Sequence, residues 1–425
     1  MTHSRIQLPG LKNTIKIIII IFFYGSLHLS AQQDSTKYRD ISGPASVDKQ
    51  LIYDDVKSTK TALWYALDSL DQIKERYYKK TGFILNMDYN SQVMEATNPI
   101  GNSTGASGVF RMYGKWNFIG KGTKNEGGLI YKVEHRHKYT DNALREFGPL
   151  DVGYAGFLQS VYNNQGWRVT NLYWRQSFNE EKVVAYFGFV DITDWTDVWA
   201  LASPWTGFNN LVFASGSGTL GGGLPDGSFG AMVSVWANDN IYLVGSLVDT
   251  NGDATEFWKG FDSFFTEFET VKTLEIGYTP SPDEVFLRNA HISVWQADER
   301  TNAGTPNGWG VIGSVSWLIG EKYFPFIRGG WAKDGGSFYE ASVSLGVGYN
   351  IAGPNTLGVG FNWNKPMEST FGAPLDNQYG TEIYYKWQLT HHFELTPNFQ
   401  FVGNPAFNPD KNSSLVFGLR GRIGI

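Results

Sequence analysis

The stretch Tyr379–Ile425 reads YGTEIYYKWQLTHHFELTPNFQFVGNPAFNPDKNSSLVFGLRGRIGI. It predicts two strands joined by a short turn, then a loop and a terminal strand. In the terminal strand, Phe417 and Leu419 fall on one face, because side chains alternate across a strand with a period of two. Arg420 and Arg422 fall on the opposite face. This alternation favours a barrel whose last strand pairs with its first, which leaves no open edge in lipid.

The composition fits a chain made of many strands and turns. The 425 residues include 49 Gly, 16% aromatic residues and no Cys. The absence of Cys excludes a disulfide scaffold and a thiolate metal site. The length allows one large domain or two ordinary ones.

The N-terminus carries the pattern of a secretory signal over residues 1–31. Basic residues precede the apolar run Ile17–Tyr24, which is too short to cross a bilayer as a helix. We expect cleavage after Ala31, the alternative being an uncleaved anchor. Removing residues 1–31 takes away three basic and no acidic residues, which changes the net charge from −6 to −9. Because nucleic-acid-binding domains are basic, we expect no nucleic-acid partner.

The exported chain divides into a short leader and a long region of strands. Residues 32–60 are polar and irregular in pattern. Thr61–Lys80 predicts a helix, because its apolar residues recur at three- and four-residue spacing. We expect a leader and amphipathic helix over 32–81 and an outer-membrane β-barrel over 82–425. The helix is expected to pack at a barrel mouth, with a regulatory plug as the alternative.

From residue 82 onward the apolar residues recur with a period of two. Most of the resulting segments have about 9–12 residues, the length that a tilted membrane strand needs. Long and short connections alternate between them, as in barrels with short periplasmic turns and long external loops. An extra strand over Gly153–Asn163 would break this alternation. The sixteen expected strands are 82–90, 106–118, 128–137, 167–178, 182–190, 228–237, 241–249, 270–278, 289–297, 309–318, 323–331, 338–349, 354–363, 379–389, 393–401 and 413–425.

The two faces of the expected strands differ in polarity. In 106–118, Arg111 and Lys115 share one face, and aromatic residues share the other. Apolar-out and polar-in alternation is typical of a membrane barrel. With about sixteen strands the interior is wide enough for water, so charged residues can face it without being buried. The sequence therefore predicts an all-β, transmembrane antiparallel β-barrel with a short N-terminal helix.

Three stretches also carry motifs of a known family. Glu382–Ile425 contains a tyrosine-rich strand, then QLT, LTP, a QF strand, an Asn-Pro loop and VFGLR. Leu172–Asp194 (LYWRQSFNEEKVVAYFGFVDITD) and Gly245–Asp253 (GSLVDTNGD) match two further motifs. In these stretches the sequence resembles the carbohydrate-selective porins of the OprB type. It departs from them at Ile425, where such barrels usually end in an aromatic residue. The resemblance implies a sixteen-stranded porin that passes sugars by diffusion through a narrow eyelet.

The candidate binding residues come from the charged strand faces and from the longest connection. Sugar passage needs apolar platforms for the pyranose faces and charged or amide groups for the hydroxyls. We hypothesise that loop 191–227, which also holds Asp191 and Trp205, folds into the barrel and forms the eyelet. The alternative is a loop that caps the outside with its Trp residues packed together or at the membrane interface. The candidate pore residues are Arg111, Lys132, Glu134, Arg136, Tyr173, Arg175, Asp194, Trp195, Asp197 and Trp199.

Other motifs fit chemistry less well. His135 and His137 share a strand face, but they continue its apolar side, which favours the membrane interface over a metal site. The segment Asp249–Asp253 lacks the Gly and Glu that a calcium loop needs. His391 and His392 lie in a tight turn without a nearby Ser or Cys nucleophile. We therefore expect no metal, no cofactor and no catalysis.

Together these observations predict an outer-membrane porin for passive, carbohydrate-selective diffusion. The expected permeants are mono- or oligosaccharides, the expected surroundings are outer-membrane lipid, and a homotrimer is a candidate assembly. A general or anion-leaning porin is the first alternative, because Arg and Lys crowd the expected lumen. An outer-membrane barrel enzyme and a secreted β-rich lectin are the alternatives from other classes.

Overall fold

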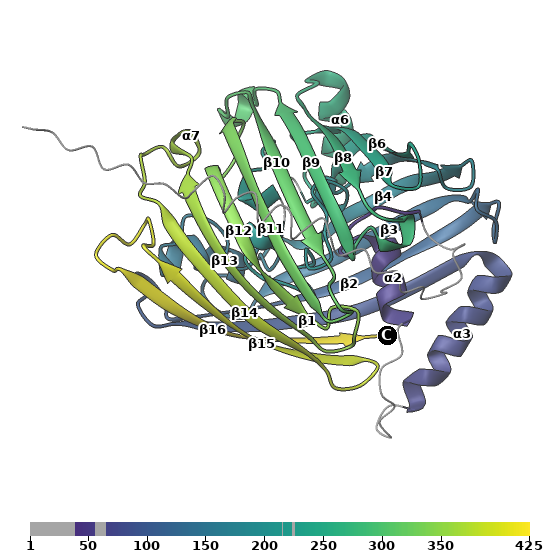
Figure 1. Cartoon of the computed structure of the whole chain (residues 1–425), viewed down its shortest axis with the longest axis horizontal. Helices are drawn as coiled ribbons and strands as arrows, with labels where there is room; N and C mark the ends of the chain where they lie inside the picture. The colour runs from purple at the N-terminus through teal and green to yellow at the C-terminus, as the bar shows by residue number, and fades with distance from the viewer. Residues whose placement is uncertain (1–38, 56–64, 215, 223–225) are drawn as a thin grey trace, which may run out of the picture. The chain divides into compact units, whose positions relative to one another are not determined.

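Sixteen antiparallel strands close into a barrel within the part of the chain that the computed structural model describes, residues 39–55, 65–214, 216–222 and 226–425 (Figure 1). Each strand pairs with its sequence neighbours, and β1 pairs with β16 from Asp88–Gly424 to Ala96–Val416. The predicted fold class is confirmed, whereas the expected signal lies outside the described residues. The strands are β1 (Phe83–Ala96), β2 (Thr104–Ile119), β3 (Gly127–Lys138), β4 (Gly166–Phe178), β5 (Val183–Val190), β6 (Ser228–Trp236), β7 (Ile241–Asp249), β8 (Thr270–Tyr278), β9 (Arg288–Ala297), β10 (Gly308–Trp317), β11 (Tyr323–Asp334), β12 (Tyr339–Tyr349), β13 (Thr356–Pro366), β14 (Gln378–Gln388), β15 (Phe393–Gly403) and β16 (Ser413–Gly424).

The period-two pattern located every expected strand. The bounds of β7 and β8 agree with the sequence prediction, and β1 extends to Ala96, beyond the expected end at residue 90. The extra strand considered over Gly153–Asn163 does not form. Tyr154, Leu158 and Tyr162 pack instead in a buried cluster inside the barrel. Their apolar side chains therefore reflect this packing and not a membrane strand.

The predicted faces of the strands are confirmed, but the expectation that inward charged residues escape burial is wrong, because segments inside the barrel cover them. In β2 the side chain of Arg111 is fully buried, whereas Trp116 is 43% exposed on the outer surface. In β14 Glu382 is buried and Tyr385 is exposed. The outward band is apolar and aromatic, and the inward surface is polar, as expected for a barrel with lipid outside and a polar interior.

The helices lie in the connections and near the N-terminus. None of those in the described ranges combines the length and apolar character that a bilayer crossing requires. The helical segments are α2 (Val47–Asp55), α3 (Tyr65–Thr81), α4 (Leu144–Glu146), η2 (Phe147–Val152), η3 (Ile192–Asp194), α5 (Leu211–Ala214), η4 (Gly216–Gly218), α6 (Phe257–Thr266), η5 (Pro282–Glu284), η6 (Thr301–Ala303) and α7 (Glu368–Phe371).

Helix α3 confirms the expected helix, of which residues 61–64 lie outside the described residues. It packs near the start of β1, where the ring of Tyr77 meets the edge of Phe83 at 6.1 Å between centroids. Lys121 in the β2–β3 turn donates from Nζ to the carbonyl of Lys79 at 2.7 Å. The helix therefore lies beside the short-turn end of the barrel, as the packing interpretation predicted (Figure 1).

The prediction of an irregular leader over residues 32–60 is wrong at Val47–Asp55, which form α2. The helix lacks a broad apolar stripe, since only Val47 and Leu51 among its apolar residues are buried. Its other inward side chains are polar and meet polar groups of the barrel wall, for example Gln50 against Arg111. Hydrophobic periodicity therefore could not reveal it.

Candidate functional site

Loop 191–227, which follows β5, crosses the barrel interior and binds the opposite wall. Arg420 on β16 donates from Nη1 to the carbonyl of Pro204 at 2.7 Å and to Oδ1 of Asn209 at 2.6 Å. Glu382 on β14 accepts hydrogen bonds from the backbone amides of Asn209 at 2.7 Å and Asn210 at 2.9 Å. The loop is therefore held inside the barrel and does not cap it.

A second set of contacts fixes the start of the loop to β8, β9 and β11. The backbone amide of Asp197 donates to Oε2 of Glu275 at 2.8 Å. The carboxylate of Asp197 pairs with Nε2 of His291 at 2.8 Å and with the guanidinium of Arg328. Asp197 and Arg328 have no exposed side-chain surface. Since a buried ion without a partner of opposite charge is strongly unfavourable, the docked position requires both Asp197 and Arg328.

The aromatic residues of the loop pack on the wall in two groups. Trp199 stacks on Phe324, with 6.2 Å between centroids, and lies 4.6 Å from Phe326. Trp195 packs against Tyr173 and Tyr186 at 5.4 and 4.9 Å. Both Trp side chains are buried, so they shape the docked loop and do not form an open platform.

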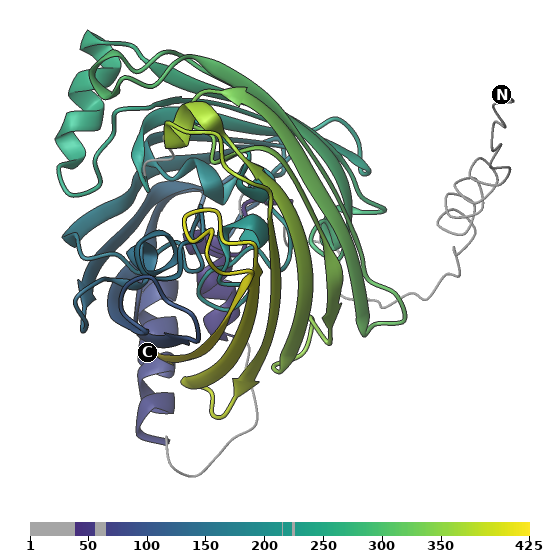
Figure 2. The same cartoon turned by 90° about the vertical axis from the view of Figure 1, so that its left-hand side faces the viewer.

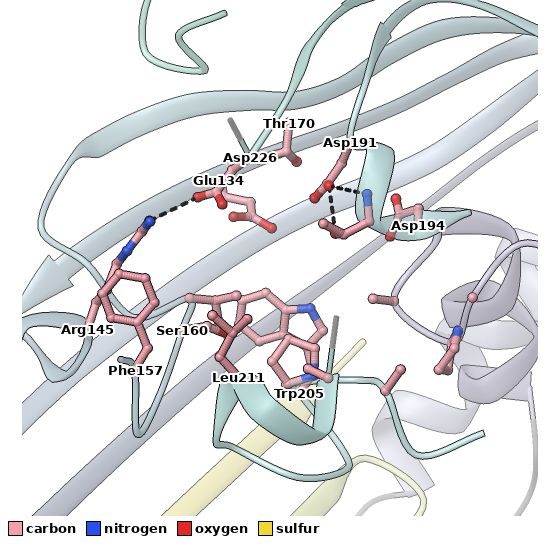
Figure 3. Close-up of a pocket in the computed structure, with 18 of the residues that line it drawn as sticks. Glu134, Arg145, Phe157, Ser160, Thr170, Asp191, Asp194, Trp205, Leu211 and Asp226 are labelled. Carbon is pink, nitrogen blue, oxygen red and sulfur yellow. Dashed lines mark hydrogen bonds and ion pairs between the residues drawn. The ribbon is translucent and has the colours of Figure 1, made fainter. Parts of the chain in front are cut away.

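A cavity that is partly open to solvent remains between the loop and strands β3 and β4 (Figure 3). Figure 3 shows Asp191, Asp194 and Asp226 along one side of it and Trp205 across from them. The cavity thus combines charged groups with an aromatic surface, which are the two kinds of group that a sugar site uses. Its charged lining residues are Lys132, Glu134, Arg136, Arg145, Asp191, Asp194 and Asp226, and its aromatic ones are Phe157, Trp205 and Phe338.

Asp226 is the main counter-charge for the arginines of this cavity. Its Oδ2 lies 2.7 Å from Arg136, 2.8 Å from Arg168 and 3.7 Å from Arg145. Arg136 also pairs with Glu134 at 2.6 Å. Burial alone raises the pKa of Asp226, but Arg136 and Arg168 outweigh it and lower this pKa well below its usual value. Asp226 therefore stays ionised and, together with Glu134, balances two of the three positive charges of this cluster.

The opposite end of the cavity is acidic. Asp191 accepts hydrogen bonds from the amide and hydroxyl of Thr193 at 3.0 and 2.7 Å, which begins η3. Asp194 lies 3.7 Å from Nζ of Lys132. Burial raises the pKa of Asp194 to about 7, although Lys132 acts in the opposite direction. The charge at this end therefore changes near neutral pH.

Trp205 lines the cavity beside these charges, with only 3% of the residue exposed. The guanidinium of Arg111 lies 4.0 Å from the centroid of its ring, a cation–π contact. Arg111 is in turn held by an ion pair with Asp88 on β1. The indole is therefore fixed by the wall behind it.

Helix α2 fills part of the lumen nearer the short turns. Asp54 pairs with Arg422 on β16 at 2.6 Å, and Asp48 pairs with Lys115 on β2 at 3.0 Å. Tyr53 donates to Glu394 on β15 at 2.8 Å. These contacts join α2 to β2 on one side of the β1–β16 pairing and to β15 and β16 on the other. The helix therefore narrows the lumen at the short-turn end.

The structure brings only part of the predicted site to the cavity. Four of the ten candidates line it: Lys132, Glu134, Arg136 and Asp194. The other six lie around it: Arg111 behind Trp205, Arg175 near Asp48, Tyr173 and Trp195 packed together, and Asp197 and Trp199 at the anchor of the loop. The role of all ten in binding stays a prediction.

Several lining residues were not identified from the sequence. Arg145 and Phe157 belong to the connection between β3 and β4, which also turns inward. The guanidinium of Arg145 lies 4.7 Å from the ring centroid of Phe157. The unusual length of that connection was the available signal, because long loops of barrels often fold inside. Asp226 stands alone at the end of loop 191–227 and had no motif to mark it.

Comparison with known proteins agrees with this architecture. Residues 288–424 match the model of the carbohydrate-selective porin, OprB family. No curated protein sequence matches the chain.

Solved structures with a similar fold are porins. A high-pH structure of Pseudomonas putida OprB aligns with a TM-score of 0.65 at 13% identity, covering 84% of this chain and 97% of that one. A low-pH structure of the same protein aligns with a TM-score of 0.51 at 12% identity, covering 87% and 99%. A mutant of the Rhodopseudomonas blastica porin aligns with a TM-score of 0.50 at 14% identity, covering 81% and 100%. The resemblance to the carbohydrate-selective porins is therefore confirmed over residues 288–424, on a barrel that has the fold of a porin.

Proposed function

We propose that the protein is an outer-membrane porin that passes sugars by passive diffusion through the cavity beside loop 191–227. The observation that carries this proposal is the pairing of opposite charges around an aromatic surface in the narrowed lumen of a porin barrel. Ion pairs offer hydroxyl groups both donors and acceptors, and the small part of Trp205 that lines the cavity offers an apolar contact for a pyranose ring. The family match over residues 288–424 supports the choice of carbohydrate.

The balance of charge favours neutral sugars over anions. The basic groups that suggested an anion-leaning porin are mostly balanced, since Asp226 and Glu134 contact the three arginines and Lys132 lies near Asp194. An entering anion would have to compete with these carboxylates. A neutral sugar needs only to exchange hydrogen bonds with water and with the paired groups. A general porin remains the second candidate, favoured by the low sequence identity to the porins of similar fold.

The pathway has two narrow zones in series. Solutes first meet the docked loop 191–227 and then α2, whose carboxylates are paired with Lys115 and Arg422. Helix α2 lies in the solute pathway. Since ion pairs and hydrogen bonds attach it to the wall, the constriction that it forms is polar. We assign it the second restriction to flow.

The remaining assignments follow from this function. Residues 1–31 act as the export signal, and the barrel lies in the outer membrane with its short turns toward the periplasm. The protein acts as a channel without catalysis. A homotrimer is the candidate assembly. The proposed pore residues are those on the cavity, with Trp205, Asp226 and Arg145 added to the four candidates that line it.

A liposome-swelling assay tests the function. Vesicles that contain the purified barrel should swell in isotonic solutions of neutral mono- or disaccharides faster than in solutions of organic anions of similar size. Trp205→Ala should change the ranking among sugars, whereas Trp116→Ala, on the outer surface of β2, should leave it unchanged. Equal swelling rates for sugars and anions of one size would favour the general porin. Intact barrels that produce no swelling would reject both.

A further inference from the structure

Helix α6 presents an apolar face that no described residue of the chain covers. Its sequence is FWKGFDSFFT, in the connection between β7 and β8. Trp258 is 70% exposed and Phe265 is 64% exposed, and Phe261 is exposed beside them. At 100° per residue these three side chains share one side of the helix. The side of the helix that packs most closely on the barrel contains the buried residues Gly260 and Ser263, and Phe261 and Phe265 also contact Phe229 of the wall.

The packed side fixes α6 against the outside of the barrel wall. Ser263 donates from Oγ to Asp249 at the end of β7 at 2.9 Å. The outward ring of Phe229 on β6 lies 4.9 Å from Phe261 and 5.7 Å from Phe265 between centroids. A Cβ at Gly260 would meet Phe189 on β5 at 3.3 Å, so the small residue permits this close approach. The helix thus continues the outward aromatic surface of β5 and β6.

The strands beneath α6 are the shortest of the described barrel. β5 has 8 residues, and β6, β7 and β8 have 9 each, whereas β1 has 14 and β2 has 16. At about 3.3 Å per residue and a tilt near 40°, strands of this length reach ~20–23 Å along the membrane normal. The apolar band of an outer-membrane barrel is about 25 Å tall. This part of the wall is therefore too low to match the membrane by itself.

We infer that α6 is a membrane-docking helix whose exposed aromatic face inserts among the acyl chains of the outer leaflet. It lies at the long-loop rim above the shortest strands (Figures 1 and 2). Its length of about 15 Å and its aromatic residues extend the apolar band where the strands end early. The polar side of the helix, with Lys259, Asp262 and Thr266, then points toward the headgroups and water. The inference rests on the proposed outer-membrane location.

Single-cysteine labelling tests this docking, because the chain contains no Cys. Trp258→Cys and Phe265→Cys place a fluorescent label on the apolar face, and Thr266→Cys places it on the polar face as the matched control. Ile383→Cys, on the outer surface of β14, reports insertion of the barrel itself. Each labelled barrel is reconstituted in vesicles whose lipids carry bromine in the acyl chains, which quenches only labels among those chains.

Labels at 258, 265 and 383 should lose most of their emission, and the label at 266 should keep most of its emission. Quenching at 383 without quenching at 258 and 265 would overturn the docking of α6 and leave the barrel assignment intact. Protection of 258 and 265 from both brominated lipid and aqueous iodide would overturn it in favour of a second copy of the chain. No quenching at 383 would overturn the membrane location and the inference with it.

Discussion

The anchor of loop 191–227 gives the sharpest test of how the lumen is narrowed. In Asp197→Asn the side chain keeps its shape but loses its charge, and Arg328 stays buried opposite it. Removing one partner of a buried ion pair costs about 3–5 kcal/mol. Glu275 also interacts with Arg328 electrostatically, so we take the lower end, about 3 kcal/mol. At about 1.4 kcal/mol per tenfold change, the ratio of docked to undocked loop falls by roughly 100-fold.

Single-channel recording reads this ratio directly. An undocked loop widens the lumen, so in Asp197→Asn the ratio of time at higher conductance to time at normal conductance should be about 100-fold larger than in the wild type. Asp239→Asn is the matched control, because Asp239 pairs with Arg39 at 3.0 Å but is 72% exposed. Exposed pairs contribute about 0–1 kcal/mol, so that variant should behave as the wild type. Identical dwell times in Asp197→Asn and the wild type would refute the claim that this ion pair holds the loop.

Three further predictions concern the pathway itself. Trp205→Ala should weaken block of the current by sugars by about two- to tenfold, as expected for loss of an aromatic contact of ~0.5–1.5 kcal/mol, and a titration of sugar against current measures it. Asp194 loses its proton as the pH rises through about 7, so cation selectivity, read from reversal potentials, should rise over that range and stay flat in Asp194→Asn. Deleting residues 32–55 removes α2 and should raise the open conductance, and an unchanged conductance would contradict its place in the pathway.

The barrel could be predicted from the sequence because a membrane strand alternates apolar residues, which face lipid, with polar residues, which face the interior. Residues such as Trp116 and Tyr385 face outward, and Arg111 and Glu382 face inward, so polarity alone assigns their faces. The alternation of long and short connections then favoured an outer-membrane barrel. Each of these signals is local, which explains why all sixteen strands could be located.

The interior was less predictable because its contacts join distant segments. Helix α2 is held by Asp54–Arg422 and Asp48–Lys115, which are polar contacts that leave no apolar period. Only part of the site could be predicted, because it too is formed by contacts between distant segments. The charged face of β3 follows from alternation, whereas the position of Asp226 among arginines of three segments depends on how two loops fold inward.

The central claim is that sugars pass through, and bind weakly within, the narrowed lumen. Titrating mono- and oligosaccharides against the current through single channels in a planar bilayer tests it most directly. The account predicts stepwise channels that sugars block in a saturable way, with block weakened in Trp205→Ala. Open channels whose current is indifferent to every sugar would contradict it and leave a general porin.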